Sequence, residues 1–252
     1  MKFLSSIALA FFVFSSVAAQ QNDLQFYYSQ APFKMPLVTL PTFSSKTFNI
    51  KDYGGINDGQ TLNTIAFAKA ITACSAAGGG MVVVPSGLWL TGPIEFKSNI
   101  NLVVERGALI QFTTDHTQYP IVKGAAASPI YGADLKNIAI TGEGIIDGAG
   151  DSWRPLKKDK ATERQWKEIT ATGIISKDGK IWWPSKAAMD GEEFVKQLKA
   201  KDAKPNDVDF LPARDFLRPY MVMFSKCDNL LIEGVTIRNS PKFIFYPSKC
   251  TN

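Results

Sequence analysis

The chain has 252 residues, of which 28 are Lys or Arg, 23 are Asp or Glu and three are cysteines. This length is enough for one large domain, and we expect a single domain interrupted by one insertion. Three cysteines exclude a small disulfide-stabilised scaffold, because such domains contain cysteine at a far higher density. The slight excess of basic residues is compatible with an anionic partner but does not identify one.

The first 19 residues have the features of a secretory signal peptide. Lys2 precedes an apolar run over residues 3–17, and small residues follow it. The run is shorter than the roughly 20 residues that a membrane span needs, and no stop-transfer charges follow, so a membrane anchor is the less favoured alternative. We therefore expect cleavage near Gln20, secretion to the extracellular space or the periplasm, and no membrane association afterwards. Residues 20–47 would form an N-terminal extension.

One helix is expected early in the main domain, which we place at residues 48–252. Phe67, Ala70, Ile71 and Cys74 recur at the i, i+3, i+4, i+7 spacing of a buried helical face, and three consecutive glycines at positions 78–80 end the pattern. A short amphipathic helix before a series of strands is what a solenoid needs to cover its first open end. We expect this helix to be that cap, with Cys74 in the core.

From residue 81 onward, short β-branched runs alternate with Gly, Pro and Asn. Segments 101–104, 137–140 and 229–232 align with one another, each beginning with Asn and each followed by Gly and a second short run. Such strands are too short for a doubly wound sheet, and no long helices separate them as βαβ crossovers would require. The pattern predicts an all-β fold, a parallel β-helix. The aligned Asn101, Asn137 and Asn229 suggest a side-chain ladder, with simple turn preference as the alternative.

A pentapeptide repeat marks the period of this coil. Ser-Lys-Cys-Asp-Asn at residues 225–229 returns as Ser-Lys-Cys-Thr-Asn at residues 248–252. A fixed offset of roughly twenty-odd residues is typical of a solenoid turn. Cys227 and Cys250 should then stack in successive turns, as two buried thiols rather than a disulfide. We expect the chain to end within the coil, so that the β-helix is C-terminally incomplete.

The regular pattern breaks between residues 151 and 217. This stretch is rich in charged residues and tryptophans, whereas the strands before and after it look like neighbours in the coil. Insertions in a solenoid tend to emerge on one side, which is often the binding side. We therefore expect a large insertion that projects from one face.

Several motifs together resemble a known family. They are Asp-Tyr-Gly-Gly at 52–55, the glycine-rich strand at 78–87, the segment at 140–148, Arg218-Pro219 and Asn-Ser-Pro at 239–241. In this order they are similar to the N-terminal portion of the polygalacturonases, glycoside hydrolases of family 28 in the pectin lyase-like superfamily. The resemblance implies a right-handed parallel β-helix, hydrolysis of α-linked galacturonan with inversion of configuration, and no cofactor.

The same resemblance implies that no catalytic residue can be assigned. The four family motifs Asn-x-Asp, Asp-Asp, Gly-His-Gly and Arg-x-Lys are all absent from the sequence. We therefore expect a fragment of a secreted hydrolase that is inactive alone. One alternative is a non-catalytic β-helix module that binds acidic polysaccharide. Another is a fragment of a pectate-lyase-type enzyme, for which acidic Ca²⁺ ligands and an Arg base would be needed.

The insertion supplies the candidate binding residues Trp182, Trp183, Lys180 and Arg154. Aromatic faces and fixed cations suit an anionic sugar polymer such as pectin or polygalacturonate. The alternative is that the tryptophans pack the insertion onto the coil and the cations are solvated. Nucleic acid is not an expected partner of a secreted chain, whereas self-association through an open last turn is.

Other titratable residues are given structural interpretations. Glu143, Asp147 and Asp151 lie in ordinary turn sequences and need not converge on one site. His116 follows Asp115 and is the single histidine, so a structural or exposed role is favoured over a proton shuttle. No second His or Cys stands at a metal-coordinating spacing from it, and no metal is expected.

Overall fold

The computed structural model describes residues 25–252, so the predicted signal peptide lies outside the described residues. The chain divides into two compact units, Met1–Thr39 and Leu40–Asn252. The first unit contributes a short helical segment at residues 25–30. The coil and its insertion belong to the second unit.

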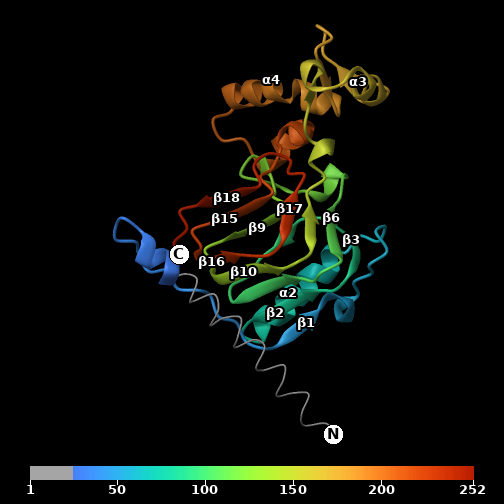
Figure 1. Cartoon of the computed structure of the whole chain (residues 1–252). Helices are drawn as coiled ribbons and strands as arrows, with labels where there is room; N and C mark the ends of the chain where they lie inside the picture. Colours follow the sequence, from blue (N-terminus) through green and yellow to red (C-terminus); the bar gives the residue numbers. More distant parts are fainter. Residues whose placement is uncertain (1–24) are drawn as a thin grey trace. The chain divides into compact units, whose positions relative to one another are not determined.

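The coil is built from three sheets, and neighbouring strands within each sheet are parallel (Figure 1). The first sheet contains β1 (Thr47–Asn49), β2 (Gly80–Val84), β5 (Ile100–Val104), β10 (Lys136–Gly142) and β16 (Asp228–Ile232). The second contains β3 (Gly87–Thr91), β6 (Ala108–Phe112), β11 (Ile145–Asp147) and β17 (Thr236–Arg238). The third contains β4 (Ile94–Glu95), β9 (Ile130–Ala133), β15 (Val222–Ser225) and β18 (Phe245–Ser248). The chain visits the three sheets in turn, and the predicted parallel β-helix is confirmed.

Alternation of side chains along each strand explains why the coil closes around an apolar core. In β5, Ile100, Leu102 and Val104 are fully buried, whereas the residues between them are half-buried. Ile100 lies opposite Ile138 of β10, which lies opposite Leu230 of β16. Because strands in adjacent turns are in register, each inward position stacks on an equivalent apolar side chain above and below it.

The predicted helix is present as α2 (Thr64–Ala76). Its four predicted core residues, Phe67, Ala70, Ile71 and Cys74, are each at most 1% exposed. The helix ends as expected, since Gly78 and Gly79 adopt positive φ and their amides donate to the carbonyls of Ser75 and Cys74. It packs beside β1 and β2, where a cap is expected to lie, and the capping role itself stays a prediction.

An asparagine ladder is present, but one of its members differs from the prediction. Asn137 Nδ2 donates to Asn99 Oδ1 at 3.1 Å, and Asn229 Nδ2 donates to Asn137 Oδ1 at 2.9 Å. Asn101 instead lies opposite Ala139 and accepts a hydrogen bond from Thr141. The predicted register was therefore wrong by two residues at this turn. All three ladder residues have positive φ, so turn preference and ladder formation operate together.

The repeated pentapeptide occupies equivalent places in successive turns. Ser225 of β15 lies opposite Ser248 of β18, as the repeat predicts. Lys226 and Lys249, which follow them, both adopt the left-handed conformation. Cys227 is buried and Cys250 is half-buried, and both are free thiols.

Two long loops leave the coil at the same corner of successive turns. Residues 113–129 connect β6 to β9, and residues 148–221 connect β11 to β15, so both run from the second sheet to the third. The second loop includes the predicted insertion. It contains α3 (Glu163–Ile169), α4 (Lys186–Lys201), η5 (Asp207–Phe216) and a small antiparallel sheet of β12 (Leu156–Lys157), β13 (Ile174–Ile175) and β14 (Ile181–Trp183). Figure 1 shows α3 and α4 projecting beyond the sheets.

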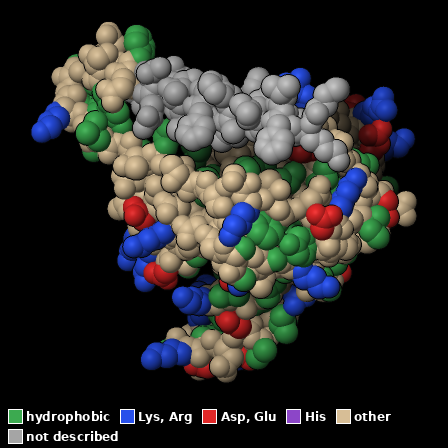
Figure 2. Space-filling model, turned by 90° about the horizontal axis from the view of Figure 1, so that it is seen from below, with side chains coloured by type: hydrophobic (Ala, Val, Ile, Leu, Met, Phe, Trp, Pro, Cys, Tyr) green, Lys and Arg blue, Asp and Glu red, His purple; other side chains and the backbone are tan. Residues whose placement is uncertain are grey.

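Charge is mixed on the face of the molecule seen in Figure 2. Lys and Arg side chains are scattered over this face and are interspersed with Asp and Glu. This distribution agrees with the small net charge of +5. Across residues 25–252, no helix has the length and apolar character needed to cross a membrane.

Candidate functional site

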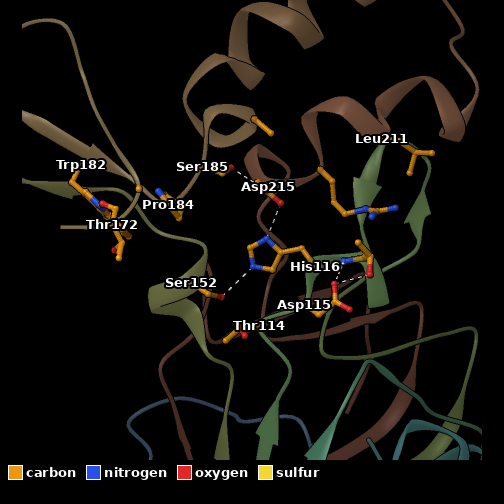
Figure 3. A pocket seen from close by; sticks show the side chains of 14 residues that line it. Thr114, Asp115, His116, Ser152, Thr172, Trp182, Pro184, Ser185, Leu211 and Asp215 are labelled. Atoms are coloured by element: carbon orange, nitrogen blue, oxygen red, sulfur yellow. Dashed lines mark hydrogen bonds and ion pairs between the residues drawn. The ribbon is translucent and has the colours of Figure 1, made fainter. Parts of the chain in front are cut away.

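A pocket of about 510 Å³ lies where the two corner loops meet (Figure 3). One wall comes from loop 113–129, which contains η2 (His116–Gln118). The other walls come from the insertion, through η3 (Gly150–Ser152), the start of α4, and η5. Because the loops leave the same corner of adjacent turns, residues far apart in the sequence come together here.

His116 is the centre of a hydrogen-bonded chain in this pocket. Its Nδ1 lies 2.8 Å from Asp215 Oδ1, and its Nε2 lies 3.1 Å from Ser152 Oγ. The Ser185 hydroxyl donates to Asp215 Oδ2 at 2.5 Å. The hydrogen bond from His116 lowers the pKa of Asp215 and, together with Ser185, outweighs burial, which would raise it. Since Asp215 is thereby kept ionised, Nδ1 is the protonated ring nitrogen that faces it.

Aromatic side chains fix the plane of the imidazole. The Trp153 ring stacks on His116 with centroids 3.5 Å apart and an interplanar angle of 19°. Tyr119 meets Trp153 edge to face at 5.1 Å, and both of these side chains are fully buried. The His116 side chain is left 11% exposed. A ring held in this way cannot turn away from its two hydrogen-bond partners without breaking the stack.

Local helix caps explain how the sequence places the polar residues. Asp115 caps η2, since its carboxylate accepts from the Thr117 amide at 2.9 Å, and its hydrogen bonds with Thr117 lower the pKa of Asp115. Ser185 caps α4 in the same way and accepts from the Ala188 amide at 3.1 Å. The Ser185 side chain therefore serves two purposes, since it begins a helix and also holds the carboxylate of Asp215.

Arg214 adds an unsatisfied donor to the pocket lining. Its Nε is buried and has no hydrogen-bond partner among the described residues. A buried donor without an acceptor is costly, and in native structures it calls for a specific explanation such as a bound ligand. Together, the imidazole, two serine hydroxyls and this guanidinium can move a proton and bind a polar ligand.

A second polar cluster surrounds Asp147 on the coil itself. Asp147 accepts from the Ala149 amide at 3.0 Å, from Arg238 Nε at 2.8 Å and from Asn239 Nδ2 at 3.0 Å. Burial would raise its pKa, but these hydrogen bonds outweigh burial and keep the pKa below its usual value. Asn239 also donates to Asp151 at 2.7 Å. Asp147 and Asp151 therefore both accept hydrogen bonds from the side-chain amide of Asn239.

The third carboxylate of the predicted turn sequences, Glu143, lies apart from that cluster and pairs with Arg106. Among the described residues, no group of three or more His, Cys, Asp or Glu side chains is arranged to hold a metal ion. Asp147 is the last residue of β11 and Asp151 lies in η3, so only Glu143 stands in a turn between two strands, and the structural interpretation of the three carboxylates stays a prediction.

The four predicted binding residues do not share one surface. Trp182 is only 7% exposed, donates from Nε1 to the Thr172 carbonyl at 2.5 Å and lines the pocket. Trp183 is half-buried beside it in β14, and Lys180 is exposed. Arg154 is directed to the coil, where it donates to the Ser240 carbonyl and to Asn239. Of the four, only Trp182 lines the pocket, and carbohydrate binding by this set stays a prediction.

The sequence alone did not reveal the partners of His116. Ser152 and Asp215 lie 36 and 99 residues from it along the chain, and both belong to the insertion. No local motif connects them. The topology could have predicted that these residues are close, because two long loops that leave the same corner of adjacent turns must lie side by side.

Comparisons with known proteins agree with this architecture. Residues 47–135 match a family described as "Rhamnogalacturonase A/epimerase, pectate lyase-like". An exo-poly-alpha-D-galacturonosidase of Dickeya chrysanthemi is 32% identical over 219 residues, which cover 81% of this chain and 34% of that protein. The resemblance to the polygalacturonases is confirmed. A probable polygalacturonase of Vitis vinifera is 37% identical over 122 residues, covering 42% of this chain and 25% of that protein.

A solved structure extends the polygalacturonase resemblance to three dimensions. The hyperthermoactive exopolygalacturonase of Thermotoga maritima aligns with a TM-score of 0.61 at 32% identity, covering 84% of this chain and 46% of that one. The Yersinia enterocolitica family 28 exopolygalacturonase, at 22% identity and a TM-score of 0.53, shares the fold. The chain spans about a third or less of the length of the curated polygalacturonases above.

Proposed function

We propose that this chain carries the first turns of a secreted, pectin-degrading glycoside hydrolase of the polygalacturonase type. The observation that carries the proposal is the alignment of 81% of the chain with an exo-poly-alpha-D-galacturonosidase at 32% identity. The stacked parallel sheets and the loops collected at one corner supply the scaffold for a polysaccharide-binding face. Anionic polysaccharide is the proposed partner.

We further propose that the chain of 252 residues does not cleave pectin by itself. Inverting hydrolysis needs one carboxylic acid that stays protonated near neutral pH and a second carboxylate that activates water. Where the pKa of a described carboxyl group departs from its usual value, it is lowered, as at Asp115, Asp147 and Asp215. A lowered pKa favours an ionised carboxylate, which is the opposite of what a general acid requires.

The two parts of this proposal are tested separately with the purified chain. Affinity electrophoresis in a gel containing polygalacturonate should retard the chain, whereas a gel containing neutral dextran should not. An assay for reducing ends should detect no cleavage of polygalacturonate. Equal mobility in both gels would contradict the proposed partner, and release of reducing ends would contradict the proposed inactivity.

Self-association of the 252-residue chain is a further part of the proposal. β17 and β18 are outer strands of their sheets and present unpaired edges, whereas the start of β16 is paired with Thr251 and Asn252. Beside these edges lies an open apolar hollow of about 610 Å³, lined by Leu230, Ile232, Val235, Ile237 and Phe245 among others. We expect oligomers or aggregates in light scattering. A monodisperse monomer at micromolar concentration would refute this expectation.

Secretion is the remaining part of the proposal. Expression of the full chain in a secreting host should give a mature protein that begins near Gln20, because the apolar segment 3–17 is followed by small residues. Intact-mass measurement of the medium or periplasm checks the start of the mature chain. Recovery of an uncleaved chain from the membrane fraction would instead support an anchor.

A further inference from the structure

His116 joins a serine hydroxyl to a carboxylate through its two ring nitrogens. Nε2 lies 3.1 Å from Ser152 Oγ, and Nδ1 lies 2.8 Å from Asp215 Oδ1. A serine next to a base that is itself oriented by a third group is the geometric signature of an activated nucleophile. Figure 3 shows the imidazole between these two partners, at the wall of the pocket.

We propose that this pocket is an acyl-transfer site in which Ser152 attacks small carboxylic esters. The chemical class is a small carboxylic ester, and its assignment to sugars, as an acyl group on a hydroxyl or an alkyl ester of a sugar acid, rests on the function proposed above. This activity is separate from glycoside hydrolysis and does not depend on it. Ser152 is the nucleophile, His116 the general base and acid, and Asp215 a positioning residue that acts through His116.

The carboxylate of Asp215 is fixed on both sides. Oδ1 faces His116, and Oδ2 accepts the hydroxyl of Ser185, which is itself held by its cap on α4. A carboxylate immobilised in this way selects the tautomer with the proton on Nδ1 and stabilises the imidazolium that forms when Nε2 takes a proton. The stack on Trp153, at 3.5 Å, keeps the ring in that orientation.

The Ser152 hydroxyl has two acceptors that correspond to the two states of the base. Its Oγ lies 2.7 Å from the Ala149 carbonyl and 3.1 Å from His116 Nε2. When His116 is an imidazolium, Nε2 donates to Oγ and the hydroxyl proton points to Ala149. When His116 is neutral, rotation about the Cβ–Oγ bond directs that proton to Nε2, which is the reactive arrangement.

Arg214 supplies a donor for the charge that develops on the ester. Attack on a carbonyl carbon places negative charge on its oxygen, and a preorganised donor must stabilise that charge. The Arg214 side chain lines the same pocket, and its buried Nε has no acceptor in the described part of the chain. Because Nε itself is closed off from solvent, the part of the Arg214 side chain that lines the pocket is assigned as the oxyanion donor.

The reaction needs only the ester and water. Ser152 Oγ forms a bond to the acyl carbon while its proton passes to His116 Nε2, and the alcohol leaves with that proton. Water then attacks the acyl-serine, and His116 takes a proton from it. The carboxylic acid departs as Ser152 regains its proton, so the enzyme returns to its starting state and no redox partner is involved.

Covalent labelling of the full chain with a fluorophosphonate probe tests the site directly. Mass spectrometry should locate the label on Ser152, and p-nitrophenyl acetate should give a burst of nitrophenol stoichiometric with the protein. Ser152→Ala should abolish both signals. Ser176→Ala is the matched control, because this half-buried serine of the insertion binds Asp178 and does not line the pocket; it should leave both signals unchanged.

The remaining variants separate chemistry from folding. His116→Gln should lower the labelling rate at least about a hundredfold, the lower end of what a general base contributes. Asp215→Asn should move the inflection of the rate against pH to lower pH, because the carboxylate that stabilises the imidazolium is lost. A merely structural Asp215 would change the amount of folded protein without moving that inflection.

If Ser152→Ala proves unfolded by circular dichroism, Ser152→Cys tests the same geometry. The thiol at position 152 should react with iodoacetamide faster when His116 is present than when it is replaced by Gln. The proposal is overturned if the probe does not label Ser152 in the folded chain, or if folded Ser152→Ala hydrolyses p-nitrophenyl acetate as fast as the unmodified protein.

Discussion

The turns of the coil and the loop of residues 148–221 hold their side chains in different ways. In the coil, each position is repeated by the turn above and the turn below, as in the asparagine ladder and the stacked apolar residues of β5, β10 and β16. The insertion has no such copies. Its polar side chains are positioned by helix caps and by single contacts, such as the one between His116 and Asp215. We therefore expect the repeated turns to contribute most of the stability, whereas the pocket proposed for acyl transfer lies at the unrepeated corner.

The largest expected contrast comes from removing a tryptophan in each region. Trp89 in β3 is fully buried and donates to the Pro85 carbonyl at 2.7 Å, so Trp89→Ala should lower the free energy of unfolding by about 3–5 kcal/mol. Trp166 in α3 is half-buried and lies 6.0 Å from the Lys158 ammonium, so Trp166→Ala should cost about 1 kcal/mol. Urea unfolding measures both. Equal losses would show that the insertion is as tightly packed as the coil.

A pair of glycines gives the next contrast. A Cβ at Gly142, where φ is +111°, would lie 2.1 Å from the Val104 carbonyl oxygen of the preceding turn. Gly142→Ala should therefore cost about 2–4 kcal/mol, through the left-handed backbone and the clash together. Gly179 in the insertion has φ +72° and open space around its Cβ position, so Gly179→Ala should cost about 1 kcal/mol, from backbone strain alone. Thermal unfolding of the two variants should rank them in this order.

The smallest expected contrast between paired variants concerns stability at acid pH. The pKa of Asp215 is lowered in the folded chain, so its contribution to stability is present above pH 3.8 and is lost as the pH falls through the folded value. Asp215→Asn should cost about 1–2 kcal/mol at pH 7 and should weaken the loss of stability on acidification below about pH 4.

Asp190→Asn is the matched control for that measurement. Asp190 forms an exposed ion pair with Lys186 in α4, a type of contact that contributes little. Asp190→Asn should leave the loss of stability on acidification unchanged, when the stability of the insertion is measured by hydrogen exchange at a series of pH values. An unaltered pH dependence for Asp215→Asn would mean that the pairing with His116 does not attach the insertion to the loop of residues 113–129.

Much of the coil could be predicted from the sequence because repetition multiplies weak signals. The pairing of Ser225 with Ser248 follows from a pentapeptide that occurs twice. The error at Asn101 has a simple cause, since Asn also stands two residues earlier at position 99, and alternation with a period of two fits either choice. A strand pattern alone cannot select between registers that differ by two.

The site could not be predicted because nothing in it repeats. Asp215 and Ser152 meet His116 only because two loops share a corner, and neither loop length nor composition encodes which side chains then touch. The tryptophans illustrate the same limit. The sequence groups Trp182 with Arg154 because aromatic and cationic side chains both suit an anionic sugar polymer. In the structure, Trp182 is directed inward, and Arg154 binds the next turn.

The separation of ladder partners along the chain has a consequence for the order of folding. Asn99 and Asn137 are 38 residues apart, whereas Asn137 and Asn229 are 92 apart because the insertion lies between them. Closing the longer loop costs only about 0.8 kcal/mol more in chain entropy, so the final stability hardly changes. The rate is more sensitive, because distant pairings form slowly. In pulsed hydrogen exchange during refolding, the amides of β16 should acquire protection after those of β5 and β10.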